Sequence, residues 1–133
     1  SNWNTSNFVY ADSLFSYCSK LVSLDLSNWN TSNLQNAYSL FGRCRSLVSL
    51  NLNNWNTSKL KEAGFLFYSC TSLETLDLSN FDMSNATMYT RMFNNCTSLS
   101  TIKCKQAFKD WCDSTQSEIG LTNYATINWE IVD

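Results

Sequence analysis

Residues 18–44 read CSKLVSLDLSNWNTSNLQNAYSLFGRC, and this stretch decides the fold because its pattern recurs along most of the chain. The segments SNWNTSN, SNWNTSN, NNWNTSK and SNFDMSN open at positions 1, 27, 53 and 79, so each unit is 26 residues long. The third position is aromatic and the eighteenth is cysteine in every unit: Trp3, Trp29, Trp55 and Phe81, then Cys18, Cys44, Cys70 and Cys96. A fixed period predicts stacked units that share one core, because a single unit cannot bury its apolar face alone.

Each unit carries two hydrophobic periods. Apolar residues at unit positions 8, 11, 15 and 18 are spaced by three or four, which is typical of one helical face. Ser32 and Gln35 match a capping box at the start of such a helix. Gly42 and Asn94 stand where a helix of this length needs a left-handed residue to end. The unit then closes on alternating apolar residues, as in Leu24–Leu26, so we expect a helix, a turn and a short strand.

The predicted fold is an α/β, right-handed solenoid of four coils over residues 1–104, with a parallel sheet on one side and short helices on the other. Residues 105–133 leave the repeat, and we expect them to form a C-terminal capping segment. Within it, Lys105–Cys112 has helical spacing, with three residues turned inward: Phe108, Trp111 and Cys112. A last strand is predicted by the alternation of Ile127, Trp129 and Ile131.

The segment Leu21-Val-Ser-Leu-Asp-Leu carries the L-x-x-L-x-L signature of leucine-rich repeats. The fuller pattern C-x-S-L-x-x-L-x-L-S-N-x-x-x-S-N, followed by L-F-x-x-C, makes residues 1–104 resemble the BspA-like surface leucine-rich repeats of bacteria. That group includes a mycoplasma-type repeat of unknown function. The chain departs from the family pattern at Asn4-Thr5-Ser6 and its copies, where the family has Asp-Thr-Ser, and at the eleventh position, where Ala replaces Met. The resemblance implies a secreted or surface-attached protein of adhesin type, extracellular or on the cell surface, without enzymatic activity.

Composition also restricts the classes of function that we expect. The 133 residues hold 9 basic and 11 acidic side chains for a net charge of −2, which gives no electrostatic reason to bind nucleic acid or an anionic membrane. No apolar run reaches the roughly 18 residues of a transmembrane helix, so we expect no membrane insertion. The chain has no His, the commonest general base and metal ligand, and we expect no enzyme, cofactor or metal. A hydrolase is retained as an alternative only if a pocket lies between the capping segment and the last coil.

The cysteines allow several interpretations. Those at the eighteenth unit position would stack in register, where parallel side chains give poor disulfide geometry, so we expect buried free thiols. The chain has no C-x-x-C pair, which disfavours zinc. Cys104 and Cys112 lie eight residues apart outside this ladder, and a disulfide between them and two free thiols both remain open.

Two further columns have alternatives. The aromatic column could be a sugar-stacking platform, but Phe81 replaces Trp without disturbing its neighbours, which favours a core position. Asp25, Asn51 and Asp77 at one-coil spacing could hold a cation through their oxygens, and the plainer interpretation is a solvated sheet face.

The candidate ligand-binding surface is the sheet face. Its eight residues alternate outward along the four predicted strands: Ser23, Asp25, Ser49, Asn51, Thr75, Asp77, Thr101 and Lys103. Repeat proteins of this class generally bind through such an extended side. We therefore expect a non-catalytic recognition or adhesion module for a protein or glycan of a host or bacterial surface. The alternative is a structural stalk that presents another domain. The chain opens at the first position of a unit and without Met, so we expect neighbouring repeats of a longer parent chain beside it.

Overall fold

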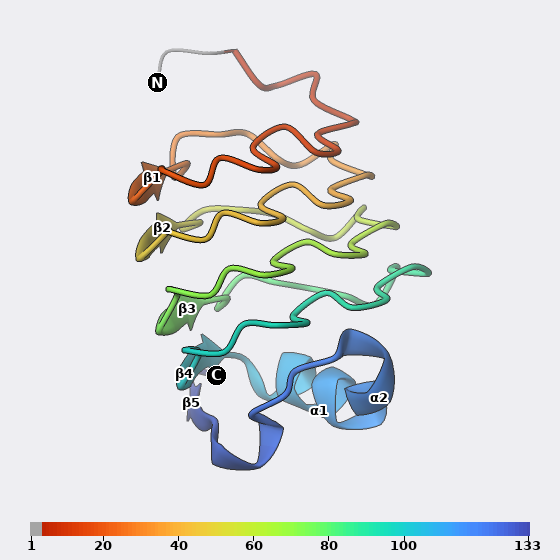
Figure 1. Ribbon diagram of the computed structural model, residues 1–133. Helices are drawn as coiled ribbons and strands as arrows, with labels where there is room; N and C mark the ends of the chain where they lie inside the picture. Colours follow the sequence, from red (N-terminus) through yellow and green to blue (C-terminus); the bar gives the residue numbers. More distant parts are fainter. Residues whose placement is uncertain (1–3) are drawn as a thin grey trace.

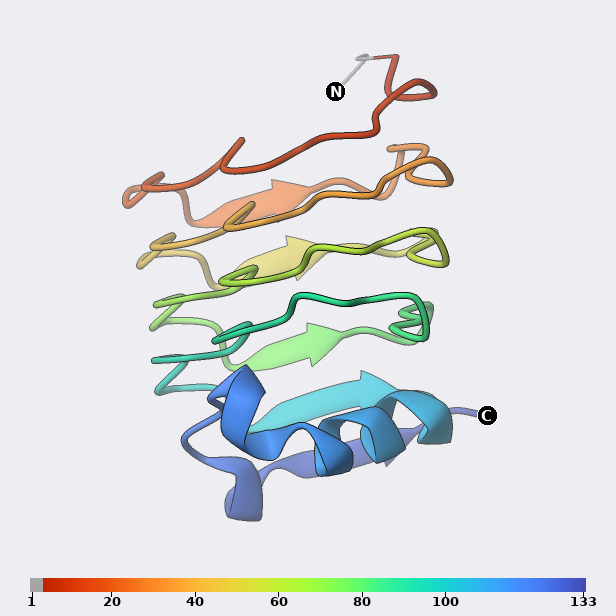
Figure 2. The ribbon, with the colours of Figure 1, turned by 90° about the vertical axis from the view of Figure 1, so that its right-hand side faces the viewer.

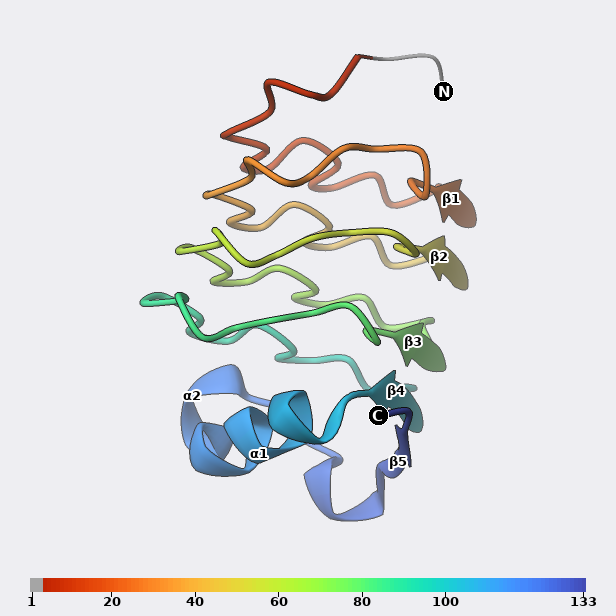
Figure 3. The same cartoon turned by 180° about the vertical axis from the view of Figure 1, so that it is seen from behind.

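A computed structural model describes residues 4–133, in which the four units lie one above another (Figure 1). The view from behind shows the same stacking (Figure 3). Each unit supplies one short strand at the same edge: β1 (Ser23–Asp25), β2 (Ser49–Asn51), β3 (Thr75–Asp77) and β4 (Thr101–Cys104). β1 pairs with β2 and β3 with β4, both in parallel and with a 26-residue register. The predicted parallel strands are confirmed, although they form two sheets, β1-β2 and β3-β4-β5, where one was expected.

The helix expected in each unit is wrong. No residue from 4 to 104 is helical, and the segment with helical spacing forms tight turns. Alternate backbone N–H groups donate to the next unit, as Ala37 does to the Glu62 carbonyl at 2.8 Å and Phe41 to the Leu66 carbonyl at 3.0 Å. A residue that lies between two such donors bonds within its own unit: the Leu40 N–H donates to the Ala37 carbonyl at 3.1 Å. Turns closed over three residues place apolar side chains at the same spacing as a helix.

The spacing between units explains why turns replace helices. Paired strands lie about 4.8 Å apart, whereas an α-helix with its side chains is about 10 Å across. Equivalent rings in the core follow the strand spacing: Phe41 and Phe67 are stacked with centroids 5.8 Å apart, and Phe67 and Phe93 are 5.4 Å apart. A helix in every unit would force the side opposite the strands to splay apart. Flat turns let the backbone pair between units on both sides.

The turns need left-handed residues, and their positions differ from those expected. The thirteenth and seventeenth residues of each unit have positive φ, for example Ser39 at 53° and Arg43 at 63°. Gly42 and Asn94, the predicted positions, each lie one residue too early, since the left-handed residues are Arg43 and Asn95. The capping box is also absent, because the Ser32 N–H donates to the side chain of Asn30 at 3.1 Å.

The core is a double ladder of aromatic rings. Trp29, Trp55 and Phe81 are buried, and successive members stack at 6.4 Å, which confirms the core interpretation for these three residues. Trp3 lies outside the described residues. The Trp55 indole N–H donates to the carbonyl of Leu26, the last residue of the first unit, at 3.1 Å, so its polar group is satisfied without solvent.

A buried threonine ties each unit to the next. Thr5, Thr31 and Thr57 are all nearly inaccessible. The hydroxyl oxygen of each accepts the N–H of the fourth residue of the following unit, at 2.7, 2.8 and 2.7 Å. The fourth unit has Met83 at this position, and helix α1 rather than a fifth unit follows it.

Residues after β4 form α1 (Gln106–Ser114), α2 (Gln116–Ile119), the short 3-10 helix η1 (Tyr124–Thr126) and β5 (Asn128–Ile131). The predicted helix and last strand are confirmed, with Phe108 and Cys112 buried and β5 pairing in parallel with β4. Figure 2 looks onto the side away from the strands and shows α1 and α2 below the fourth unit. Among the described residues, no helix has the length and apolar character needed to cross a bilayer.

The fourth unit departs from the repeat where it meets α1. Phe81, which replaces Trp, packs edge-on against Phe108 at 6.3 Å. Tyr89, which replaces Ala, packs edge-on against Trp111 at 5.1 Å. These substitutions therefore adapt the last unit to a helix, and they are visible in the sequence as breaks in the repeat.

Candidate functional site: the strand face and its neighbours

The structure brings the predicted strand-face residues together in register. Ser23 lies opposite Ser49 and Asp25 opposite Asn51 in the first sheet. In the second sheet the same two rows continue with Thr75 opposite Thr101 and Asp77 opposite Lys103. All eight side chains are exposed or half-buried, while the residues between them, such as Leu76, point into the core. The face is therefore two parallel rows of small polar groups that cross both sheets.

The residues Asp25, Asn51 and Asp77, which we call the acidic row, also stabilise the turns that follow the strands. The Oδ1 atoms of Asp25, Asn51 and Asp77 each accept the backbone N–H two residues later, at 3.0, 3.0 and 3.1 Å. These bonds form the turn that ends each strand. The side-chain and backbone hydrogen bonds of Ser27 lower the pKa of Asp25, which keeps its carboxylate ionised at neutral pH. One oxygen of each side chain is thus committed to its own backbone.

The other row, which we call the free row, contains Ser23, Ser49 and Thr75 and makes no such bonds within the described residues. Ser23, Ser49 and Thr75 are exposed, and within residues 4–133 their side chains make no hydrogen bond to the protein. Val22 and Val48 directly precede β1 and β2, and these two residues are 57% and 51% exposed. Sequence reasoning missed these valines because the alternation it used began one residue later. Exposed hydroxyls of this row thus have exposed apolar residues as their sequence neighbours in the first two units.

Acidic side chains do not cluster among the described residues of the strand face. Within the described part of the chain, no group of three or more His, Cys, Asp and Glu side chains is close enough to share a metal ion. Asp25 and Asp77 are separated by a full unit, with Asn51 between them. Each already binds a turn N–H, so their remaining oxygens face solvent singly.

The cysteine ladder is buried from its second member onward. Cys44, Cys70 and Cys96 are fully inaccessible free thiols. Each Sγ donates to the carbonyl of a phenylalanine in the preceding unit, at 3.1, 3.1 and 3.0 Å. Burial raises the pKa of Cys44 to about 11 and that of Cys96 to about 12, so both are protonated at neutral pH. The prediction of buried free thiols is confirmed for these three.

Cys18 differs from the rest of the ladder. It is a free thiol but only half-buried. It lines an open apolar hollow with Phe15, Leu21 and Leu24. The expected full burial of Cys18 is therefore wrong.

Cys104 and Cys112 are both buried, and the structure forms no bridge between them. Burial raises the pKa of Cys104 to about 11. Burial, together with the nearby Cys104, also raises the pKa of Cys112. A disulfide between Cys104 and Cys112 stays a prediction from the sequence.

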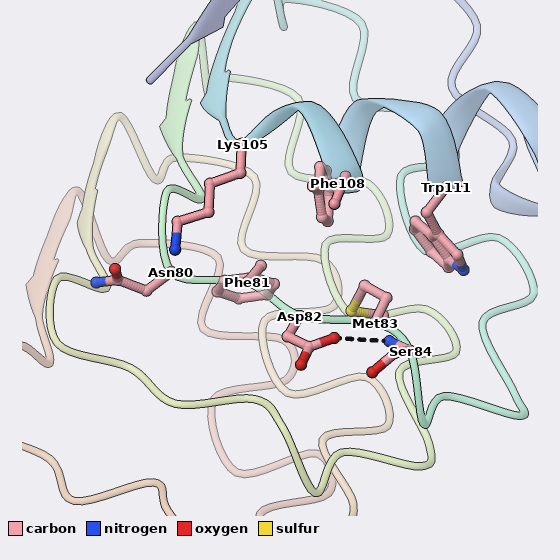
Figure 4. Close-up of a pocket in the computed structure, with 9 residues that line it drawn as sticks. Asn80, Phe81, Asp82, Met83, Ser84, Lys105, Phe108 and Trp111 are labelled. Carbon is pink, nitrogen blue, oxygen red and sulfur yellow. Dashed lines mark hydrogen bonds between the residues drawn. The ribbon is translucent and has the colours of Figure 1, made fainter. Parts of the chain in front are cut away.

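A pocket of about 440 Å³ lies between the fourth unit and α1 (Figure 4). Phe81, Met83, Phe108 and Trp111 form its apolar lining. Its charged groups are the Asp82 carboxylate and, from the start of α1, the Lys105 ammonium (Figure 4). The Ser84 side chain and N–H bind Asp82 and lower its pKa, the N–H at 2.9 Å.

The side away from the strands carries a second depression that sequence reasoning did not identify. It has a volume of about 390 Å³ and two guanidinium groups, those of Arg43 and Arg91. The Arg43 guanidinium lies over the rings of Tyr17 and Tyr68, 5.0 and 5.4 Å from their centroids. The residues that line this depression differ between units, so the constant positions of the repeat do not reveal it.

Comparison with known proteins identifies the repeat. Residues 1–111 match the family model described as mycoplasma protein of unknown function, DUF285. Among curated proteins and among solved structures, no match to the chain is found. Because the matched segment covers most of the chain and all four units, the protein belongs to the DUF285 family of mycoplasma-type proteins of unknown function.

Proposed function

We propose that the chain is a non-catalytic recognition module that binds a protein or glycan partner through its strand face, on a cell surface or outside the cell. The observation that carries the proposal is the free row of Ser23, Ser49 and Thr75 beside the exposed Val22 and Val48. Hydroxyls can bond to a partner, and the valines lose apolar surface on contact. We also propose that the stacked units form a right-handed solenoid of the leucine-rich-repeat class, with further repeats of the same kind as neighbours.

The pocket beside α1 meets the one condition under which a hydrolase stays in consideration. Its polar chemistry favours binding over catalysis. Asp82 is its one carboxylate, and a lowered pKa makes it a poor general acid at neutral pH. Hydrolysis by paired carboxylates requires two groups whose pKa values are driven apart. We therefore propose no enzymatic activity and no cofactor.

The second candidate function is a structural stalk. Two sets of hydrogen bonds favour it: the threonine bonds between units and the turn bonds of Asp25, Asn51 and Asp77. In both sets, polar side chains bond within the protein and stabilise the stack. A stalk needs a regular stack and no ligand-binding surface. Recognition predicts that substitutions in the free row reduce binding to a partner, whereas a stalk predicts that they have no effect.

The experiment displays the chain on a cell and measures its adhesion to epithelial monolayers and to a glycan array. One variant carries Ser23→Lys, Ser49→Lys and Thr75→Lys, which adds like charges to the free row without removing a turn bond. The matched control carries Gln35→Lys, Thr87→Lys and Gln116→Lys, all outside the strands. Recognition by the strand face predicts loss of adhesion in the first variant alone. Equal adhesion of the parent and both variants, or no adhesion by the parent, supports the stalk.

A further inference from the structure

The depression on the side away from the strands is lined by residues from all four units. We call it the arginine–aromatic groove, and its principal residues are Tyr17, Tyr38, Arg43, Phe65, Tyr68 and Arg91. Its volume of about 390 Å³ falls within the range of about 300–1,000 Å³ common for small-molecule sites. Ser13, Ser16 and Ser39 also line it, with the Ser16 and Ser39 hydroxyl oxygens 3.4 Å apart and the Ser16 hydroxyl within 3.3 Å of the Gly42 carbonyl.

The fold does not require these side chains, as the repeat itself shows. At the seventeenth unit position, where Arg43 stands, the third and fourth units have Ser69 and Asn95. At the thirteenth, where Phe65 and Arg91 stand, the first two units have serines. These positions have positive φ in every unit, so the turn forms equally with small side chains. Bulky and charged residues at left-handed positions are therefore an addition to the turn, since such residues adopt positive φ reluctantly.

The two guanidinium groups have no acidic partner. Within residues 4–133, the one ion pair closer than 4 Å joins Lys109 to Asp113, so no carboxylate neutralises Arg43 or Arg91. The Arg43 guanidinium is held between the rings of Tyr17 and Tyr68, which restrains its position before any ligand arrives. A restrained, unneutralised guanidinium is suited to a planar anion such as a carboxylate, which it binds through two hydrogen bonds.

The aromatic rings of the groove are also fixed. Tyr38 lies against Gly64, where an added Cβ would stand 3.3 Å from the ring, so the glycine leaves room for it. Tyr38 and Phe65 are in tilted contact at 5.5 Å, and Phe65 packs edge-on against Tyr68 at 5.2 Å. Tyr17 and Tyr38 remain exposed, at 66% and 38%. The groove thus joins fixed, partly exposed aromatic surface to a positive charge and three hydroxyls.

From this geometry we infer that the arginine–aromatic groove binds an acidic sugar, a pyranose ring that bears a carboxylate. The carboxylate bonds to Arg43, the apolar face of the ring packs on the tyrosines, and its hydroxyls bond to the bordering serines. A neutral sugar lacks the partner for the guanidinium, and a simple anion lacks the ring. The inference deepens the proposed recognition function, on which it rests only in treating the chain as a binding module, and it uses a different surface.

The test titrates the purified full chain with sialyllactose and glucuronic acid, followed by nuclear magnetic resonance chemical shifts. Lactose, the methyl ester of glucuronic acid and acetate are the comparison ligands, since each lacks either the charge or the ring. Variant Arg43→Ser introduces the residue that the third unit carries at this position, so the turn is retained. Variant Arg45→Thr, the matched control, removes the same charge from an exposed position outside the groove and introduces the residue found there in the third and fourth units.

We expect one or both acidic sugars to bind at least tenfold more tightly than all three comparison ligands. Their shifts should map to Tyr17, Tyr38 and Tyr68. Arg43→Ser should weaken binding at least tenfold, and Arg45→Thr should leave it unchanged. The inference is overturned if neither acidic sugar binds the parent chain, or if lactose or acetate binds as tightly as the acidic sugars. It is also overturned if Arg43→Ser binds the acidic sugars as tightly as the parent does. If the strand-face variant still loses cell adhesion in any of these cases, the proposed function stands without the groove.

Discussion

The hydroxyl of Thr57 holds both backbone groups of Asp82 in the next unit: Oγ1 accepts the Asp82 N–H at 2.7 Å and donates to the Asp82 carbonyl at 2.9 Å. One buried side chain thus supplies two inter-unit bonds at the corner where no strand pairing reaches. Thr31 does the same for Asn56, at 2.8 and 3.2 Å. These paired bonds join the second unit to the third and the third to the fourth, and they fix the register of the corner loops.

Replacing Thr57 by Val tests this arrangement. Valine has nearly the same shape, but it leaves the Asp82 N–H and carbonyl without their partner. We expect the free energy of unfolding to fall by about 2–3 kcal/mol, since each unsatisfied group costs about 1–3 kcal/mol. Thr57→Ser keeps the hydroxyl and should lose less than about 1.5 kcal/mol. Urea denaturation measures both, and equal stability of the two variants would show that the hydroxyl contributes nothing.

Strand alternation predicts opposite effects at neighbouring residues. Leu76 is buried in β3 while Thr75 beside it is exposed. Leu76→Asp places an unpaired charge in the shared core and should cost several kcal/mol, enough to unfold the domain. Thr75→Asp should change stability by less than about 0.5 kcal/mol. A folded circular dichroism spectrum with an unchanged melting temperature for Leu76→Asp would contradict the observed register.

The acidic row of the strand face is less tolerant than its exposure suggests. From the sequence we expect Lys at Asp25, Asn51 and Asp77 to leave stability nearly unchanged. The structure shows that each accepts a turn N–H, so Asp77→Lys should lower the free energy of unfolding by about 1 kcal/mol. Asp77→Asn keeps the acceptor and should cost less. Chemical denaturation of the two variants decides this, and a stability of Asp77→Lys equal to that of the parent would restore the earlier expectation.

Buried thiols make stability depend on alkaline pH. Burial raises the pKa of Cys96 to about 12, whereas an unfolded thiol titrates near about 8.5. The unfolded chain therefore releases this proton first, so the stabilising contribution is complete below about pH 8.5 and is lost as the pH rises toward the folded pKa. We expect the melting temperature, measured with reductant present, to fall as the pH rises from about 8.5 toward about 12. The fall should be shallower in Cys96→Ala, and an equal slope in both proteins would contradict the prediction.

Thiol reactivity should separate Cys18 from the rest of its ladder. Cys18 lines an open hollow, while Cys44, Cys70 and Cys96 are fully inaccessible. We expect iodoacetamide to modify Cys18 under native conditions and the other three only after denaturation. Peptide mass spectrometry reads the order of modification. Rapid native labelling of Cys70 would show that the stack opens, and a Cys44–Cys70 disulfide would contradict the structure of the core.

Much of the fold is predictable because the units repeat. The strand of each unit follows from alternation such as Ser23, Leu24 and Asp25, and the aromatic core follows from the recurrence of Trp29 and Trp55. The helices were wrong because a spacing of three or four also arises from turns closed by bonds such as Leu40 to Ala37. Nothing in a single unit shows that its backbone will pair with the next.

The candidate sites were predictable to different degrees. The strand-face rows could be assigned from alternation, but the turn bonds of Asp25 and Asp77 could not, because they depend on the backbone after the strand. The arginine–aromatic groove is assembled from residues that differ between units. Arg43 meets Tyr17 and Tyr68 only because neighbouring units stack in register. This groove is therefore built from the positions at which the units differ.

Backbone hydrogen bonds join the units on the side away from the strands, where a helix was expected. The most direct measurement is the through-hydrogen-bond scalar coupling between amide nitrogens and carbonyl carbons in the isotopically labelled chain. The structure predicts a coupling from the Phe41 nitrogen to the Leu66 carbonyl carbon, and from Ala37 to Glu62. A coupling from Phe41 to the Ala37 carbonyl, four residues earlier, would instead show a helix within the unit and contradict the stacked-turn arrangement.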